Sequence, residues 1–135
     1  MLYKFTENFG QDFAEEQLDL FTKYNPELDI SQHDLYEALC NSQLVGIAYL
    51  EGIRDIVGIV QVLSDKKWTA IINYCYILEN YRNQGIGTML MQGTMANLDD
   101  MPCVYVAPND MAVSSFYKKF GLNELPRAGV LMTEG

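Results

Sequence analysis

A chain of 135 residues, of which 49% are apolar and 20% charged, fits one soluble globular domain over residues 1–135. Its 18 acidic and 9 basic residues give a formal charge of −9, which argues against a nucleic-acid partner and favours a cationic one, although negative charge also serves solubility alone. No apolar run reaches the about 20 residues of a membrane span and no signal-like segment opens the chain, so we expect a cytoplasmic protein.

The first 40 residues predict one strand and two helices. Residues 2–5 fit a short strand, and from residue 12 apolar side chains recur at helical spacing until Asn25-Pro26 stops them. Ser31 is a suitable N-cap for a second helix over residues 32–40, which carries an apolar stripe.

The middle of the chain changes to β-branched and aromatic residues. Three runs, residues 44–51, 56–63 and 69–78, have this composition. The connections between them are short and rich in turn-forming residues, as expected for hairpins between neighbouring strands. We therefore predict an antiparallel meander.

The last third predicts a crossover. A glycine-rich loop over residues 81–87 leads into a helix that ends near Leu98, and residues 102–107 form an apolar strand. A helix between two strands makes them parallel neighbours in a β-α-β unit. Asn109 or Asp110 can cap a last helix with Gly121 at its left-handed end, and a closing strand or pair follows between residues 122 and 132. The expected fold is α+β, with a mixed, mostly antiparallel sheet and one parallel crossover.

The cysteines and the single histidine predict no metal site. Cys40, Cys75 and Cys103 are far apart and lie among apolar residues, which fits reduced, buried thiols better than disulfides or zinc ligands. His33 lies in a polar helical stretch without a second ligand nearby, so a solvated surface histidine is expected.

The segment Arg82-Asn83-Gln84-Gly85-Ile86-Gly87-Thr88 is the most informative because it joins a strand to a helix. The first amides of a helix have no partner inside it, and its dipole puts partial positive charge there, so an anion is stabilised. Two glycines remove Cβ atoms that would keep a diphosphate at a distance. The alternative is that they only make a tight turn.

Two common phosphate-binding loops do not fit this segment. A dinucleotide fingerprint requires a third glycine where the chain has Leu90 and an acidic residue where it has Ala107. The loop of nucleoside triphosphatases requires a lysine after its last glycine, and none follows here.

Two motifs in this order instead resemble the GNAT superfamily of acyl-coenzyme A-dependent N-acyltransferases. The first is Arg-x-x-Gly-x-Gly at residues 82–87, between a meander and a β-α-β return. The second is Asn109-x-x-Ala112 followed by the Phe-Tyr-Lys-Lys-Phe-Gly-Leu run over residues 116–122. The resemblance covers about residues 44–122 and implies acetyl-CoA as co-substrate, without a metal.

The resemblance also implies how the cofactor is held. Strands ending at Leu78 and Ala107 would splay apart, and the pantetheine arm would enter the gap, bonding the backbone of Ile77 and Leu78 on one side and Asn109 on the other. The cofactor's diphosphate would be bound by Arg82 and by the amides of Asn83, Gln84, Gly85, Ile86, Gly87 and Thr88, and Tyr117 would also contact the cofactor. Asn83 and Gln84 stand where the family commonly has glycine and a basic residue, so we expect weaker cofactor affinity.

Acetyl transfer needs a proton for the departing thiolate and a base for the amine. Tyr117 is similar in position to the family's tyrosine general acid, and a backbone amide near Ile77 or Leu78 would be the oxyanion donor. Glu79 is the nearest candidate base, with water relayed past Tyr74 or Tyr76 as the alternative.

In this superfamily the first two helices and the last strands form the acceptor pocket, here residues 13–40 and 122–135, whose tyrosines and carboxylates suit a cationic or aromatic amine. We therefore predict an N-acetyltransferase that transfers acetyl to a primary amine of a small molecule or protein by direct attack in a ternary complex. The alternatives are a non-catalytic acetyl-CoA sensor and an interaction protein with a vestigial loop. By analogy with the family, a homodimer is also expected.

Overall fold

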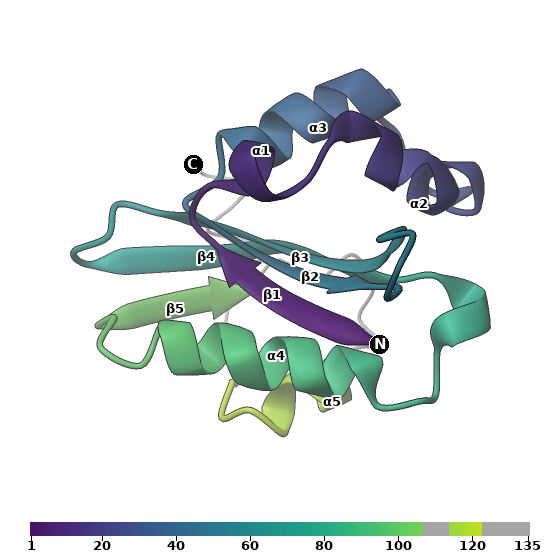
Figure 1. The fold of residues 1–135 in the computed structure, drawn as a ribbon. Helices are drawn as coiled ribbons and strands as arrows, with labels where there is room; N and C mark the ends of the chain where they lie inside the picture. The colour runs from purple at the N-terminus through teal and green to yellow at the C-terminus, as the bar shows by residue number, and fades with distance from the viewer. Residues whose placement is uncertain (107–113, 123–135) are drawn as a thin grey trace.

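The computed structural model describes residues 1–106 and 114–122, which form a five-stranded sheet between two layers of helices (Figure 1). The strands lie side by side in chain order: β1 (Leu2–Thr6), β2 (Leu44–Tyr49), β3 (Ile56–Ser64), β4 (Thr69–Ile77) and β5 (Cys103–Val106). The first four pair antiparallel, whereas β5 pairs parallel to β4. The predicted mixed sheet with a meander and a parallel crossover is therefore confirmed.

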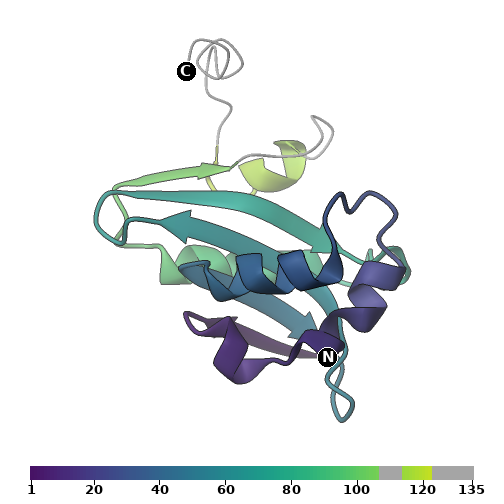
Figure 2. The same cartoon turned by 90° about the horizontal axis from the view of Figure 1, so that it is seen from above.

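Helices cover both faces of the sheet. One face carries α1 (Phe9–Asp12), the 3₁₀ turn η1 (Glu15–Leu18), α2 (Asp19–Lys23) and α3 (Gln32–Cys40), with α3 lying along the sheet when seen from above (Figure 2). The other face carries α4 (Ile86–Asn97) and α5 (Ser114–Lys118), and η2 (Glu79–Tyr81) connects β4 to α4. Because both faces are covered, β2 and β3 bury consecutive residues instead of alternating ones.

The single helix predicted from residue 12 to the Asn25-Pro26 stop is wrong: α1 ends at Asp12, and η1 and α2 follow in place of one continuous helix. Phe13 and Ala14 are extended and separate α1 from η1. The cause is tertiary packing, because the Phe13 ring stacks on Phe9 at 5.4 Å and meets Tyr49 edge-on at 5.2 Å. The second helix is confirmed, and the Ser31 hydroxyl caps it by accepting from the Asp34 amide at 3.1 Å.

Helix α4 approaches β1 closely because it carries a glycine at the contact. A Cβ atom built at Gly93 would lie 2.0 Å from Cζ of Phe5, so any side chain there would have to displace the Phe5 ring. The buried face of α4 comprises Ile86, Leu90, Met91 and Thr94.

The burial of the cysteines differs in part from the sequence expectation. Cys40 is exposed, although a buried thiol is expected there, while Cys75 and Cys103 are half-buried; all three are free. No helix in the described part of the chain is long and apolar enough to cross a membrane.

Candidate active site

The loop between β4 and α4 has the backbone conformation of an anion-binding turn. Asn83 and Gly85 have positive φ angles of 62° and 82°. The first α-helical bond runs from the Met89 amide to the Gly85 carbonyl at 3.0 Å. No hydrogen bond within the helix uses the three amides before Met89, those of Ile86, Gly87 and Thr88. These amides are therefore available to a ligand. The predicted strand-loop-helix junction is present at the predicted residues.

The two glycines of the loop have different surroundings. Gly85 needs its left-handed angle, and a Cβ there would meet open space. A Cβ at Gly87 would lie 3.6 Å from the Phe116 ring and 3.8 Å from Ile77, which is ordinary van der Waals contact. Gly87 is therefore not required for packing, and it faces the place where β4, α4 and α5 meet.

Arg82 ties the loop back to the end of β4. Its Nε donates to the Ile77 carbonyl at 2.9 Å, and its guanidinium lies 4.9 Å from the centre of the Tyr76 ring. Gln84 closes the other side of the turn by donating to the Asn80 carbonyl at 3.3 Å. Both side chains thus hold the loop in shape, so the anion-binding capacity of this turn lies in its backbone.

Of Ile77 and Leu78, both expected to bond pantetheine, only Ile77 has backbone groups that point away from β3. The Leu78 amide donates to Val57 of β3 at 2.9 Å and is already paired. Backbone groups alternate along a strand, so those of Ile77 point away from β3, toward the side of β5. Pairing with β5 covers only Thr69–Ile72 among the described residues, so β4 continues past it to Ile77.

Tyr117 lies beside β4, as the two-motif pattern requires. It is 8% exposed, and its hydroxyl is within hydrogen-bonding reach of the Cys75 thiol. Burial, with the nearby thiol, raises the pKa of Tyr117 well above its ordinary value. Burial also raises the pKa of Cys75 to about 11, against a smaller opposing effect of the Tyr117 hydrogen bond. Both groups therefore stay protonated at neutral pH, and Tyr117 is a hydrogen-bond donor.

On the face of β4 that packs against α2, three aromatic side chains, Tyr74, Tyr76 and Phe21, form an aromatic wall. Tyr74 and Tyr76 stack at 6.1 Å, and Phe21 of α2 meets Tyr76 edge-on at 5.7 Å. The Tyr74 hydroxyl accepts from Nδ2 of Asn25 at 2.8 Å, and burial raises the pKa of Tyr74 to about 12. Asn25 is 4% exposed, and its Oδ1 has no hydrogen-bond partner in the described part of the chain.

The remaining sequence expectations concern the candidate base Glu79, the cofactor ligand Asn109 and the absence of a metal. Glu79 is exposed at the start of η2. Asn109, with Ala107, Asp110 and Ala112, lies outside the described residues, as does the expected closing strand beyond Leu122. No group of three side chains in residues 1–106 and 114–122 could hold a metal ion.

Sequence reasoning missed Cys75 and Asn25 as neighbours of the site. Cys75 was expected to be an inert core thiol and Asn25 only a helix stop. Their partners Tyr117 and Tyr74 are distant in sequence, and no local signal links them.

The sequence model of the acetyltransferase (GNAT) family matches residues 4–122. The chain belongs to this family. Solved structures agree with the GNAT fold: the chain is 23% identical to a candidate acetyltransferase from Deinococcus radiodurans R1, with a TM-score of 0.77 over 92% of this chain and 84% of that one. A GNAT family protein from Streptococcus pneumoniae TIGR4 is 20% identical, with a TM-score of 0.71 over 90% and 86%.

A third similar structure carries a ligand. Naa50 from Arabidopsis thaliana, in complex with the bisubstrate analogue CoA-Ac-MVNAL, is 18% identical, with a TM-score of 0.64 over 92% of this chain and 85% of that one. No curated protein matches the sequence. GNAT membership makes this chain an acetyltransferase in the general sense, with acetyl-CoA as the family's donor.

Proposed function

We propose that this GNAT protein transfers the acetyl group of acetyl-CoA to a primary amine by direct attack in a ternary complex. The observation that carries the proposal is the meeting of three elements: the free amides at the start of α4, the unpaired end of β4 at Ile77, and buried Tyr117 beside Cys75. The bisubstrate analogue held by Naa50, in which CoA, acetyl and peptide form one ligand, supports this order of groups.

The cofactor would lie along the edge of β4. The amides of residues 83–88 would bind the diphosphate, and Asn109 would bond the arm from the side of β5. The Ile77 carbonyl would have to exchange its bond from Arg82 for one from a pantetheine amide. Such an exchange costs little, because the bond from Arg82 is exposed and water can solvate the released guanidinium.

Tyr117 would donate to the sulfur of the departing coenzyme. Its raised pKa makes complete proton transfer more uphill than for a free tyrosine, but it guarantees a protonated hydroxyl when the thiolate forms. We infer that the hydroxyl stabilises the thiolate through a hydrogen bond and passes the proton as the product leaves.

The amine would approach from the aromatic wall of β4 and α2. Glu27 and Asp29 follow α2 directly in the sequence, so a cationic amine is the acceptor that this side favours. The base would be Glu79 or a water at Tyr74. Glu79 is exposed, whereas the Tyr74 hydroxyl is held by Asn25 inside the wall, and the water route is the better supported of the two.

Ligand binding and product release test the proposal together. Acetyl-CoA at about 100 times its dissociation constant should stabilise the protein by ~2.7 kcal/mol, a rise in melting temperature of roughly 10 °C. A panel of primary amines should then release free coenzyme thiol. Stabilisation with no thiol release from any amine leaves the sensor function instead, and no stabilisation overturns cofactor binding.

Three further properties complete the proposal: one domain over residues 1–135, a cytoplasmic location, and a homodimer. Light scattering behind size exclusion distinguishes a dimer from the 15.4 kDa monomer. Limited proteolysis that leaves a single resistant core supports one domain.

A further inference from the structure

A hollow lies at the end of the molecule opposite the phosphate loop. Its volume is about 470 Å³, within the range of small-molecule sites. The ends of β1, β3 and α4 and the start of β2 form its walls. Helix α4 starts at the phosphate loop and ends at the hollow 12 residues later, which separates the two places by about 18 Å.

The hollow combines an apolar floor with an acidic rim. Leu44, Val62 and Leu98 belong to the floor, and Glu7 and Asp100 to the rim. Lys66 is the basic residue among the lining side chains, and its Nζ lies 3.8 Å from Glu7. Both partners of this pair are exposed, so it is weak and leaves the rim with a net negative charge.

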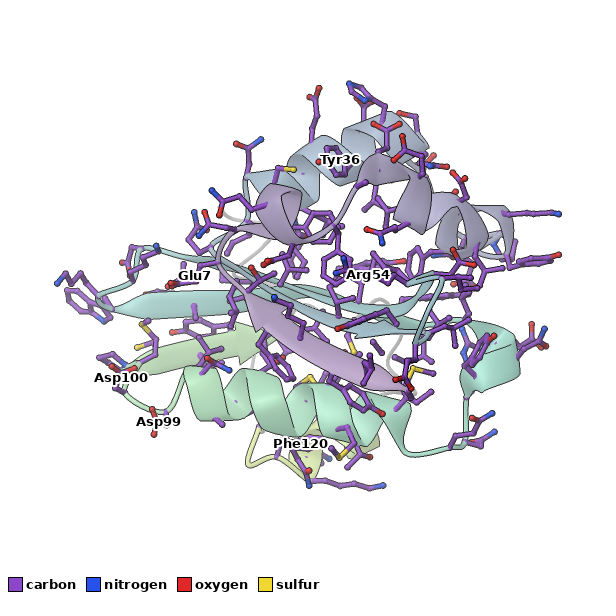
Figure 3. All side chains as sticks on the ribbon, in the orientation of Figure 1. Glu7, Tyr36, Arg54, Asp99, Asp100 and Phe120 are labelled. Carbon is purple, nitrogen blue, oxygen red and sulfur yellow. The ribbon has the colours of Figure 1, made fainter. Side chains whose placement is uncertain are left out.

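The end of α4 adds to the negative potential. A helix C-terminus carries partial negative charge and is usually complemented by a basic residue, but the last turn of α4 has none. Asp99 and Asp100 follow directly, so carboxylates stand where the helix favours cations. Figure 3 shows Asp99, Asp100 and Glu7 at this end of the molecule. A bound cation would relieve this unfavourable arrangement.

We propose that this hollow binds a primary alkylammonium ion. The ammonium group lies at the rim between Asp100, Glu7 and the carbonyl end of α4, and the alkyl chain lies on the floor. A primary amine suits the site because it joins a compact charge with three donors to an apolar chain. The site is distinct from the transfer site, and its occupation requires no acetyl transfer.

The test uses the whole protein and pentylammonium as the probe, with 1-pentanol and pentanoate as neutral and anionic analogues. Amide NMR shifts should change at Glu7, Lys66 and residues 97–101 with pentylammonium, and about threefold more of the alcohol should be needed for the same change. Pentanoate should not bind. Equal responses to the three probes, or ammonium shifts confined to α2 and β4, overturn the proposal.

Charge variants locate the ammonium group. Asp100→Asn should weaken pentylammonium binding about threefold, and Asp99→Asn, which changes a neighbouring acid outside the lining, should have a much smaller effect. Lys66→Asn should tighten binding, since it removes the competing cation and asparagine tolerates the positive φ of 66° at this position. If Asp100→Asn has no effect or Lys66→Asn weakens binding, the proposal is wrong.

Ammonium binding at the hollow is measured by NMR shifts and acetyl transfer by thiol release, so the two proposals can fail independently. If amines release no thiol from acetyl-CoA while pentylammonium still shifts residues 97–101, the proposed function fails and the ammonium site stands. If transfer proceeds and no shift appears at this end, only the ammonium site fails.

Discussion

At the scale of single residues, the hydroxyl of Tyr117 is the group whose removal separates chemistry from binding. Tyr117→Phe keeps the buried ring and loses only the donor, so kcat should fall roughly 10²-fold while the KM for acetyl-CoA stays within a factor of two. Steady-state thiol release measures both constants. Tyr105→Phe, on an exposed tyrosine of β5, is the control. An unchanged kcat in Tyr117→Phe would remove this residue from the mechanism.

Alanine in place of each of the two loop glycines should have opposite effects on the stability of the protein. Gly85→Ala forces a side chain into a left-handed angle and should cost about 1 kcal/mol of stability. Gly87→Ala meets only ordinary contacts with Phe116 and Ile77, so the free protein should be as stable or slightly more so, because alanine favours helix. Thermal melts of both variants check this.

The Gly87→Ala variant should also bind acetyl-CoA more weakly. The added methyl group faces the junction where the arm would pass, so calorimetry should show affinity lowered about tenfold or more. Full affinity in a stable Gly87→Ala protein would mean that the ligand does not use this junction.

At the scale of elements, the contact between α4 and β1 depends on a missing side chain. Gly93→Ala places a Cβ 2.0 Å from Phe5 and should cost roughly 1–3 kcal/mol. Phe5→Leu should recover part of that loss in the double variant, since the two residues share one contact. Denaturant titrations of the two single variants and the double variant measure the coupling, and strict additivity would contradict the packing described here.

The link between α3 and η1 gives the fold a pH-dependent contribution. His33 bonds Glu15 at 2.8 Å and Glu37 at 2.7 Å, and the hydrogen bond with Glu15, followed by the charges of both carboxylates, raises the pKa of His33 above 6.5. The folded state binds this proton more tightly, so the stabilisation is complete below 6.5 and is lost as pH rises through the raised value. The melting temperature should fall as the pH rises above about 6.5, and His33→Gln should remove most of that fall. An equal fall in the variant would assign it to other groups.

The elements that the sequence predicts well are those set by local chemistry. Strands β2 to β4 follow from β-branched runs, and the turn at Gly85 follows from a backbone angle that few residues adopt. The break at Phe13 is not predictable in this way, because stacking on Phe9 and Tyr49 decides it. For the same reason the site's motif residues are predictable, whereas the neighbours Cys75 and Asn25 come only from tertiary packing.

At the scale of the whole molecule, charge is distributed unevenly between the layers. The first 40 residues hold nine of the 18 acidic side chains and two of the nine basic ones, Lys4 and Lys23. These residues include the whole layer of α1, α2 and α3, which covers the β4 face opposite α4. The acceptor side of the proposed site therefore lies under a negative potential, which would draw a cationic amine toward it.

Ionic strength tests this potential directly. Raising the salt from about 0.02 M to about 0.2 M shortens the Debye length from roughly 20 Å to roughly 7 Å, so kcat/KM for a dicationic amine should fall several-fold. For an amine with no second charge the decrease should be much smaller. Glu27→Gln with Asp29→Asn should reduce the salt dependence for the dication, while Glu51→Gln, on the β2–β3 turn outside this layer, serves as the matched control. A salt effect that is the same for both amines would show that the acidic layer serves solubility and does not select the acceptor.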